Sequence, residues 1–196
     1  MPFSRPANRL VKGLIISWLL VTGLSSCGFG GDRRAEVETA ASSSINGPSD
    51  LINTETGVRI TVPADWTPVN GRQRGSADIY AAAPDDQDLY VMVMSESAST
   101  LNQFSLPDNA ELYHSLIQAE LDSFEEAEPT AVSSIDGKSA LQYELRGTVD
   151  GVPIVYLHTT VQGTDDYYQI VGWTTESSYR ESEDVLQSIV NSFRGT

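Results

Sequence analysis

Cysteine is nearly absent from this sequence, which contains a single copy, Cys27, among 196 residues. One cysteine cannot form an intramolecular disulfide, even in an oxidising compartment. Catalytic signatures are missing as well. Serines are plentiful, but there is no G-x-S-x-G nucleophile elbow, and the two histidines, His114 and His158, read as surface or half-buried residues. These absences argue against an enzyme that works through a nucleophile and a base.

Cationic side chains are also scarce. Lys and Arg number 12 against 27 Asp and Glu, and three of the 12 precede Cys27 whereas every acidic residue follows it. The chain from Cys27 onward therefore has nine cationic and 27 acidic residues, a net charge of −18. Such a domain repels nucleic acid and anionic lipid head groups. The charge suits either solubility alone or a basic or metal-rich partner.

Long apolar runs are missing apart from a short one near the start. Residues 14–24 are apolar except for three positions, which is too short for a transmembrane helix of about 20 apolar residues. Basic residues precede this run and small residues follow it, as in a secretory signal peptide. We therefore expect residues 1–26 to be a signal segment.

The end of that segment, Leu24-Ser25-Ser26-Cys27, resembles the bacterial lipobox. In that family the cysteine thiol takes a diacylglycerol and the signal peptide is removed just before it. Two or more acyl chains anchor a protein stably, whereas one chain binds only marginally. The resemblance predicts Cys27 to be a lipidation site that holds the protein on a membrane, not a redox or metal residue. The alternative is an incidental cysteine behind an ordinary signal peptide.

The rest of the chain divides into a tether and one domain. Residues 27–49 have few large apolar side chains and end in Asn-Gly-Pro-Ser, a composition that predicts a flexible tether. Residues 50–196 have the size of a single domain. The domain is predicted to be rich in antiparallel strands, since Val58, Ile60 and Val62 alternate with polar residues and dipeptide turns recur. We expect hairpins over 51–66 and 77–96, then strands over 130–135, 139–149, 153–163 and 166–175.

Two segments have helical periodicity. Residues 109–127 place apolar side chains on one stripe, with Asp108 as N-cap and Glu111 three positions later. Residues 178–193 form a second stripe, preceded by a capping-box match at Ser178 and Glu181. The predicted fold class is α+β, an antiparallel sheet of about six strands sandwiched by helices.

A family resemblance supports this fold. The stretch 57–66, GVRITVPADW, looks like the opening strand and VP-x-x-W corner of the PsbP and DcrB superfamily. The run from Tyr167 to Phe193 resembles its last strand and C-terminal helix, and the match covers about residues 51–194. Members include extrinsic photosystem II subunits and envelope lipoproteins of the DcrB type. The resemblance implies a non-enzymatic accessory or binding protein without a cofactor, facing the periplasm or the thylakoid lumen. In a photosynthetic host it would assist photosystem II assembly or stability.

Three residues are candidates for binding a protein partner. Arg72 and Arg74 lie in the loop after Trp66, stand out because cations are scarce, and occupy a position where recognition residues are common. They could instead only offset nearby carboxylates. Trp66 either plugs the corner after Pro63 or contributes to a binding surface.

Two residues are candidates for holding a metal. Glu111 and His114 are spaced i and i+3, so one helical face could supply two ligands, although a solvated helix face has the same pattern. The alternative function is an envelope hydrolase or metal-dependent enzyme, which would require His114 to meet carboxylates in a concave pocket.

Overall fold

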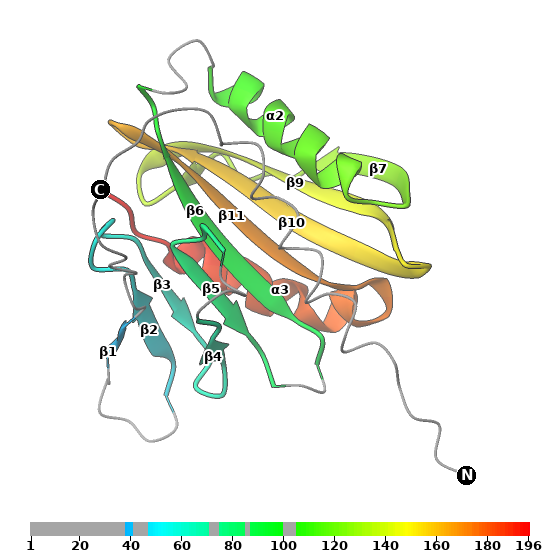
Figure 1. The fold of residues 1–196 in the computed structure, drawn as a ribbon, viewed down its shortest axis with the longest axis horizontal. Helices are drawn as coiled ribbons and strands as arrows, with labels where there is room; N and C mark the ends of the chain where they lie inside the picture. Colours follow the sequence, from blue (N-terminus) through cyan, green and yellow to red (C-terminus); the bar gives the residue numbers. More distant parts are fainter. Residues whose placement is uncertain (1–37, 41–46, 71–74, 85–86, 100–104) are drawn as a thin grey trace, which may run out of the picture.

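The computed structural model describes residues 38–40, 47–70, 75–84, 87–99 and 105–196. These residues form strands β1–β11 and helices α2 and α3 (Figure 1). The large sheet is antiparallel and has the order β4-β5-β6-β11-β10-β9-β7, with β8 also paired to β9. The expected α+β fold is confirmed, but the sheet has eight strands rather than about six.

The elements of the large sheet are β4 (Thr67–Pro68), β5 (Ile79–Ala82), β6 (Tyr90–Ser97), β7 (Ser123–Pro129), β8 (Ser134–Ile135), β9 (Lys138–Val149), β10 (Val152–Gln162) and β11 (Asp166–Thr175). The small sheet consists of β1 (Glu38–Ala40), β2 (Ser49–Ile52) and β3 (Arg59–Val62). The helices are α2 (Leu106–Ala119) and α3 (Glu176–Ser192). Because β1 pairs with β2, part of the segment predicted as a tether joins the small sheet.

The hairpins expected from alternation and turn residues are present. Strands β2 and β3 pair, and β5 pairs with β6. Val58, Ile60 and Val62 are buried while Arg59 between them is exposed. Asp150 and Gly151, which join β9 to β10, have φ angles of 49° and 76°. Two successive positive φ angles match the twist of a tight hairpin, which is why Asp-Gly serves there.

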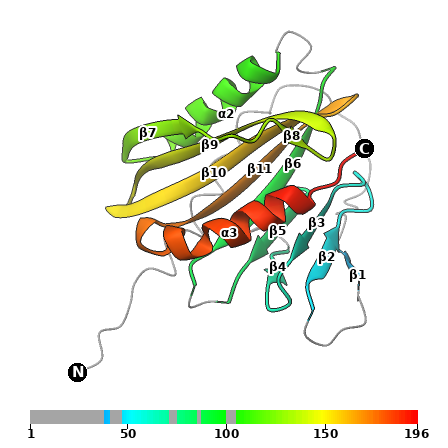
Figure 2. The same cartoon turned by 180° about the vertical axis from the view of Figure 1, so that it is seen from behind.

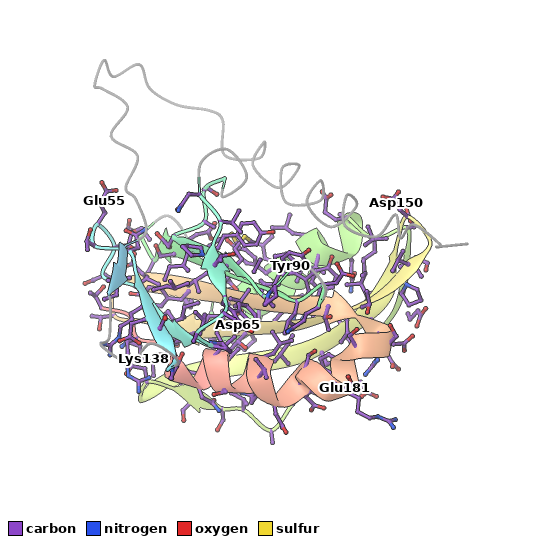
Figure 3. The ribbon with its side chains drawn as sticks, turned by 90° about the horizontal axis from the view of Figure 1, so that it is seen from below. Glu55, Asp65, Tyr90, Lys138, Asp150 and Glu181 are labelled. Carbon is purple, nitrogen blue, oxygen red and sulfur yellow. The ribbon has the colours of Figure 1, made fainter. Side chains whose placement is uncertain are left out.

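The two helices cover opposite faces of the sheet. Figure 1 shows α2 on the near side, and the reverse view in Figure 2 shows α3 across β10 and β11. Figure 3 places Glu181 on α3 and Tyr90 toward the other side of the sheet. We call these the α3 face, which includes Leu157 and Ile170, and the α2 face, which includes His158 and Val171. Alternation along β10 and β11 sends neighbouring residues to different faces.

The α3 face carries an apolar core. Leu186, Ile189, Val190 and Phe193 are each 0–1% exposed, as their helical stripe predicted. They pack with apolar side chains of the sheet and of β3. Gly172 makes this close approach possible, because a Cβ there would lie 2.7 Å from a methyl group of Leu186.

One predicted helix is wrong in its second half. Helix α2 ends at Ala119, and Ser123–Pro129 form strand β7 paired with β9. Pairing satisfies backbone groups along the edge of β9, a tertiary demand that the local stripe could not reveal. All β7 residues are exposed, and Phe124 is 40% exposed rather than packed on a helix stripe. Gly147 permits the approach, since a Cβ there would lie 2.4 Å from the Ser123 carbonyl oxygen.

Both predicted helix starts are also displaced. The N-cap of α2 is Ser105, and Asp108 is its third helical residue. Ser105 and Asp108 exchange hydrogen bonds in a capping box, so the motif exists three residues earlier than expected. Helix α3 begins after Thr175, whose side chain makes no cap hydrogen bond, and Ser178 lies inside the helix. The strand expected over 130–135 is reduced to the two residues of β8.

Candidate functional site

The α2 face is the part of the core where polar groups concentrate. Helix α2 contacts β10 and β9, and its buried residues are Asn109, Ala110, Tyr113 and Ile117. Their spacing brings one stripe of the helix onto the sheet. Asn109 is 0% exposed, so this stripe inserts an amide group between the helix and the strands.

The Asn109 amide belongs to a chain of hydrogen bonds. The Gln169 side-chain nitrogen donates to the Asn109 Oδ1, and the Gln169 Oε1 accepts from Thr160 at 2.8 Å. The same Oε1 lies 2.7 Å from His158 Nε2, which must be the donor because an amide oxygen only accepts. This bonding assigns the neutral His158 ring to the tautomer with its proton on Nε2.

The two histidines of the chain meet at this network. His114 comes from α2 and His158 from β10, and their ring centroids lie 5.1 Å apart with nearly perpendicular planes. The Tyr143 ring of β9 also lies edge-on to His114, with centroids 4.2 Å apart. The Tyr113 ring stacks on His158 from α2, with centroids 6.0 Å apart. Nothing in the local spacing of the two histidines indicated this contact, because they lie on different elements.

Three buried nitrogens in this cluster have no hydrogen-bond partner: Asn109 Nδ2, His114 Nε2 and His158 Nδ1. Burial lowers the pKa of His158 to about 3, against the partly compensating hydrogen bond to Gln169. Burial also lowers the pKa of His114. Both imidazoles are therefore neutral at neutral pH.

Next to these polar groups, the α2 face carries a cluster of aromatic side chains. The Trp173 ring of β11 stacks with Tyr80, Tyr90 and Tyr156, with ring centroids 5.3–6.2 Å apart. These four rings are 2–7% exposed. Each contributes a large apolar area, and offset stacking adds to the energy of their burial. The rings join Leu145, Ile117 and Val171 in a second hydrophobic cluster.

The loop predicted to bind a partner is anchored in this cluster at both ends. Val69 and Ala77 pack with the aromatic residues, and the Val69 N–H donates to the Tyr80 carbonyl oxygen. Arg72 and Arg74 between them lie outside the described residues. Trp66, the third candidate, is 5% exposed and packs in the core of the α3 face. Its side chain is therefore packed at the corner after Pro63, as one of the two alternatives expected.

The two metal candidates do not converge. Glu111 is exposed, whereas His114 is half-buried against Tyr143 and His158. Within the part of the chain that the structure describes, no group of three or more His, Cys, Asp and Glu side chains could hold a metal ion. The spacing of Glu111 and His114 thus corresponds to a helix with one solvent-exposed face and one face packed on the sheet.

A charged cluster on the α3 face was also missed from the sequence. The Arg146 guanidinium pairs with Glu144 and, at 3.3–3.5 Å, with Glu126 and Glu176. Burial alone would lower the pKa of Arg146, but these carboxylates raise it. The Tyr179 hydroxyl donates to Glu144 at 2.7 Å. The cluster ties β7, β9 and α3 together and leaves no uncompensated cation for a ligand.

A groove of about 440 Å³ lies between α3 and the small sheet. Its lining combines apolar residues with four polar ones: Pro48, Val62, Pro63, Val185 and Ile189, and Thr61, Asp184, Ser188 and Ser192. These described lining residues include no histidine or cysteine, and the Ser192 hydroxyl is already hydrogen-bonded to the Thr61 backbone, so they present no nucleophile paired with a base. The groove therefore gives no support to the enzyme alternative.

The anchor predicted at Cys27 lies outside the described residues. Within those residues, neither helix is long and apolar enough to cross a membrane.

Comparisons with known proteins identify the fold. A scan against protein-family models and a search of curated proteins found no match. Among solved structures, cyanobacterial PsbP (CyanoP) from Synechocystis is similar over 88% of this chain and 99% of its own, with 15% identity and a TM-score of 0.60. LpqN of Mycobacterium tuberculosis, involved in cell envelope biogenesis, matches over 82% and 91%, with 15% identity and a TM-score of 0.47. The chain has a PsbP-like fold, as the VP-x-x-W corner and the closing strand and helix suggested.

Proposed function

We propose that this chain is a lipid-anchored, non-enzymatic accessory protein that binds a membrane protein complex on the extracytoplasmic side. The observation that carries the proposal is the fold shared with CyanoP over 88% of the chain. In a photosynthetic host the complex would be photosystem II, by analogy with PsbP. In another bacterium it would be an envelope complex.

The anchor is tested by fractionation. Replacing Cys27 with Ala removes the thiol that would take the lipid, so we expect the variant to move from the membrane to the soluble fraction. Ser25→Ala is the matched control, because it keeps a small residue in the lipobox and should leave the protein on the membrane. If the Cys27→Ala protein still sediments with membranes, lipid anchoring through this residue is wrong.

Partner binding is tested through the loop between Val69 and Ala77. The double variant Arg72→Ala with Arg74→Ala should capture less partner from native membranes, and the difference should shrink as salt is raised. Arg180→Ala is the matched control, because Arg180 is an exposed cation on α3 and not part of this loop. Equal partner yields from the double variant, the control and the wild type would remove the loop from the proposed function.

A further inference from the structure

We infer that α2 is a pH-sensitive cover, held on β9 and β10 while His114 and His158 are neutral and released when they take up protons. The strands beneath and helix α3 remain folded on release. This inference concerns the domain alone and does not depend on the lipid anchor or on any partner.

Among the described residues, the surroundings of the two histidines offer no hydrogen-bond acceptor to an additional proton on either ring. His158 is 0% exposed, and its Nε2 proton is already used by the Gln169 Oε1. A second proton would go to Nδ1, which faces no acceptor. His114 has the same problem at Nε2, and a charge on either ring would lie about 5 Å from the other imidazole. A buried charge without a partner is costly, so the protonated pair favours the open state.

The groups around the pair offer little compensation. From α2 the pair meets the Tyr113 ring, from β9 the Tyr143 ring, and from β10 and β11 the side chains of Thr160 and Gln169. One carboxylate contacts a residue of this cluster: Glu96 of β6 hydrogen-bonds Tyr113. In the described part of the chain, neither histidine forms an ion pair with a carboxylate. Glu111 on α2 is exposed and faces away from the buried stripe.

Helix α2 is also attached weakly enough to open alone. It packs chiefly on β9 and β10, whereas α3 packs on β10, β11 and β3. One of the buried residues of α2 is Asn109, whose Nδ2 has no hydrogen-bond partner. The strands beneath it are held by their own ladders, β10 with β9 and β11. Figure 1 shows α2 lying along the sheet rather than threaded between layers, so its departure breaks no strand pairing. Elements with few buried apolar contacts are those that open locally.

The expected size follows from linkage. With a pKa of about 3 when closed and about 6.5 when open, His158 favours the closed state above pH 6.5 and increasingly less as the pH falls toward 3. Between pH 7.5 and 5.0 the opening constant of α2 should rise about thirtyfold from His158 alone. The lowered pKa of His114 acts in the same direction.

Hydrogen exchange on the full chain tests the inference, with α3 as the internal reference because it contains no histidine. After correction for intrinsic exchange, protection of α2 amides should fall at least thirtyfold from pH 7.5 to 5.0 and lie below that of α3. A parallel fall in both helices would mean that α2 opens only with the whole domain and would overturn the inference. No fall in α2 would overturn it as well.

Two further measurements address the histidines directly. The double variant His114→Gln with His158→Gln keeps side chains that hydrogen-bond but do not titrate, so its α2 protection should be independent of pH over this range. Persistence of the fall would assign the effect to other groups and overturn the inference. The imidazole resonances of the wild type need no variant: His158 should show the neutral Nε2–H tautomer at pH 6. A charged His158 at that pH would contradict the proposal that this imidazole is buried and neutral beneath α2.

Discussion

The two faces of the sheet are covered by one helix each, but the helices are held by different forces. Helix α3 presses Leu186, Ile189 and Val190 into an apolar core that leaves these side chains 0–1% exposed. Helix α2 settles on a network in which His158, Gln169 and other polar groups are buried. The stability gained from apolar packing does not depend on pH. The stability of a contact that buries an imidazole does, because the imidazole titrates. The same architecture thus combines a structural face with a conditional one.

The distribution of unsatisfied groups sharpens this difference. Three of the buried polar atoms without partners, on Asn109, His114 and His158, gather between α2 and the sheet. On the α3 face the Tyr168 hydroxyl donates to the Thr196 carbonyl oxygen at 2.8 Å, and a single unpartnered hydroxyl, that of Thr174, stands among the described residues of β10 and β11 on that face. Since buried polar groups are normally paired, a cluster of unpaired ones marks a place where stability has been given up. We expect perturbations of the two faces to differ accordingly.

The largest effect should come from the α3 face. Phe193 is 0% exposed and its ring centroid lies 5.1 Å from that of Tyr168. Phe193→Ala should lower the free energy of unfolding by about 3–5 kcal/mol, because it leaves a cavity in a closely packed core. Urea denaturation at pH 7.5 measures this. Phe124→Ala on exposed β7 is the control and should cost less than about 0.5 kcal/mol. A loss below about 1 kcal/mol for Phe193→Ala would contradict the packing of α3.

A smaller effect should come from pH and arise on the α2 face. The pKa of His158 is about 3 in the folded protein and about 6.5 in the unfolded chain. The unfolded chain therefore binds more protons between these values, and stability falls as the pH drops below 6.5. The free energy of unfolding should be about 2 kcal/mol lower at pH 5.0 than at pH 7.5.

Denaturation curves at the two pH values measure this loss, and His158→Gln should abolish most of it. An equal loss in the variant would assign the pH dependence to carboxylates elsewhere and remove the proposed contrast between the faces.

The smallest effect distinguishes the two helix starts. The Ser105 hydroxyl accepts from the Asp108 N–H in the capping box of α2, whereas Thr175 makes no cap hydrogen bond at the start of α3. Ser105→Ala should cost about 1 kcal/mol, and Thr175→Ala distinctly less. Thermal unfolding of both variants at pH 7.5 makes the comparison. Equal losses would show that the capping box of α2 contributes no more than the hydroxyl contacts of Thr175 with Ser177 and Ser178.

How far the sequence predicted the fold depends on the kind of signal. Strand alternation at Val58, Ile60 and Val62 and the Asp150-Gly151 turn correctly predicted hairpins, because these signals are local. The helical stripe expected over 109–127 was misleading, because residues from 123 onward pair with β9 instead of continuing the helix. Gly147 within a strand was the one available sign of that close approach.

The candidate site was harder to predict. His114 was considered with Glu111, its neighbour on the same helix, while its actual partner, His158, lies 44 positions away on β10. Polar residues at His158, Thr160 and Gln169 within otherwise apolar strands were the available signal, since they share one face by alternation. Their meaning required knowing which helix covers that face.

By itself, the sequence determined the acidic charge, the lipobox-like segment, the hairpins and the apolar stripe of α3. These properties depend on composition or on residues only a few positions apart, so local physics specifies them. Only the tertiary structure decided that 123–129 would be a strand, that Trp66 would be buried, and that the two histidines would share one dry seat. Each of these depends on which distant surfaces meet, because burial and backbone pairing are properties of the contact and not of either segment alone.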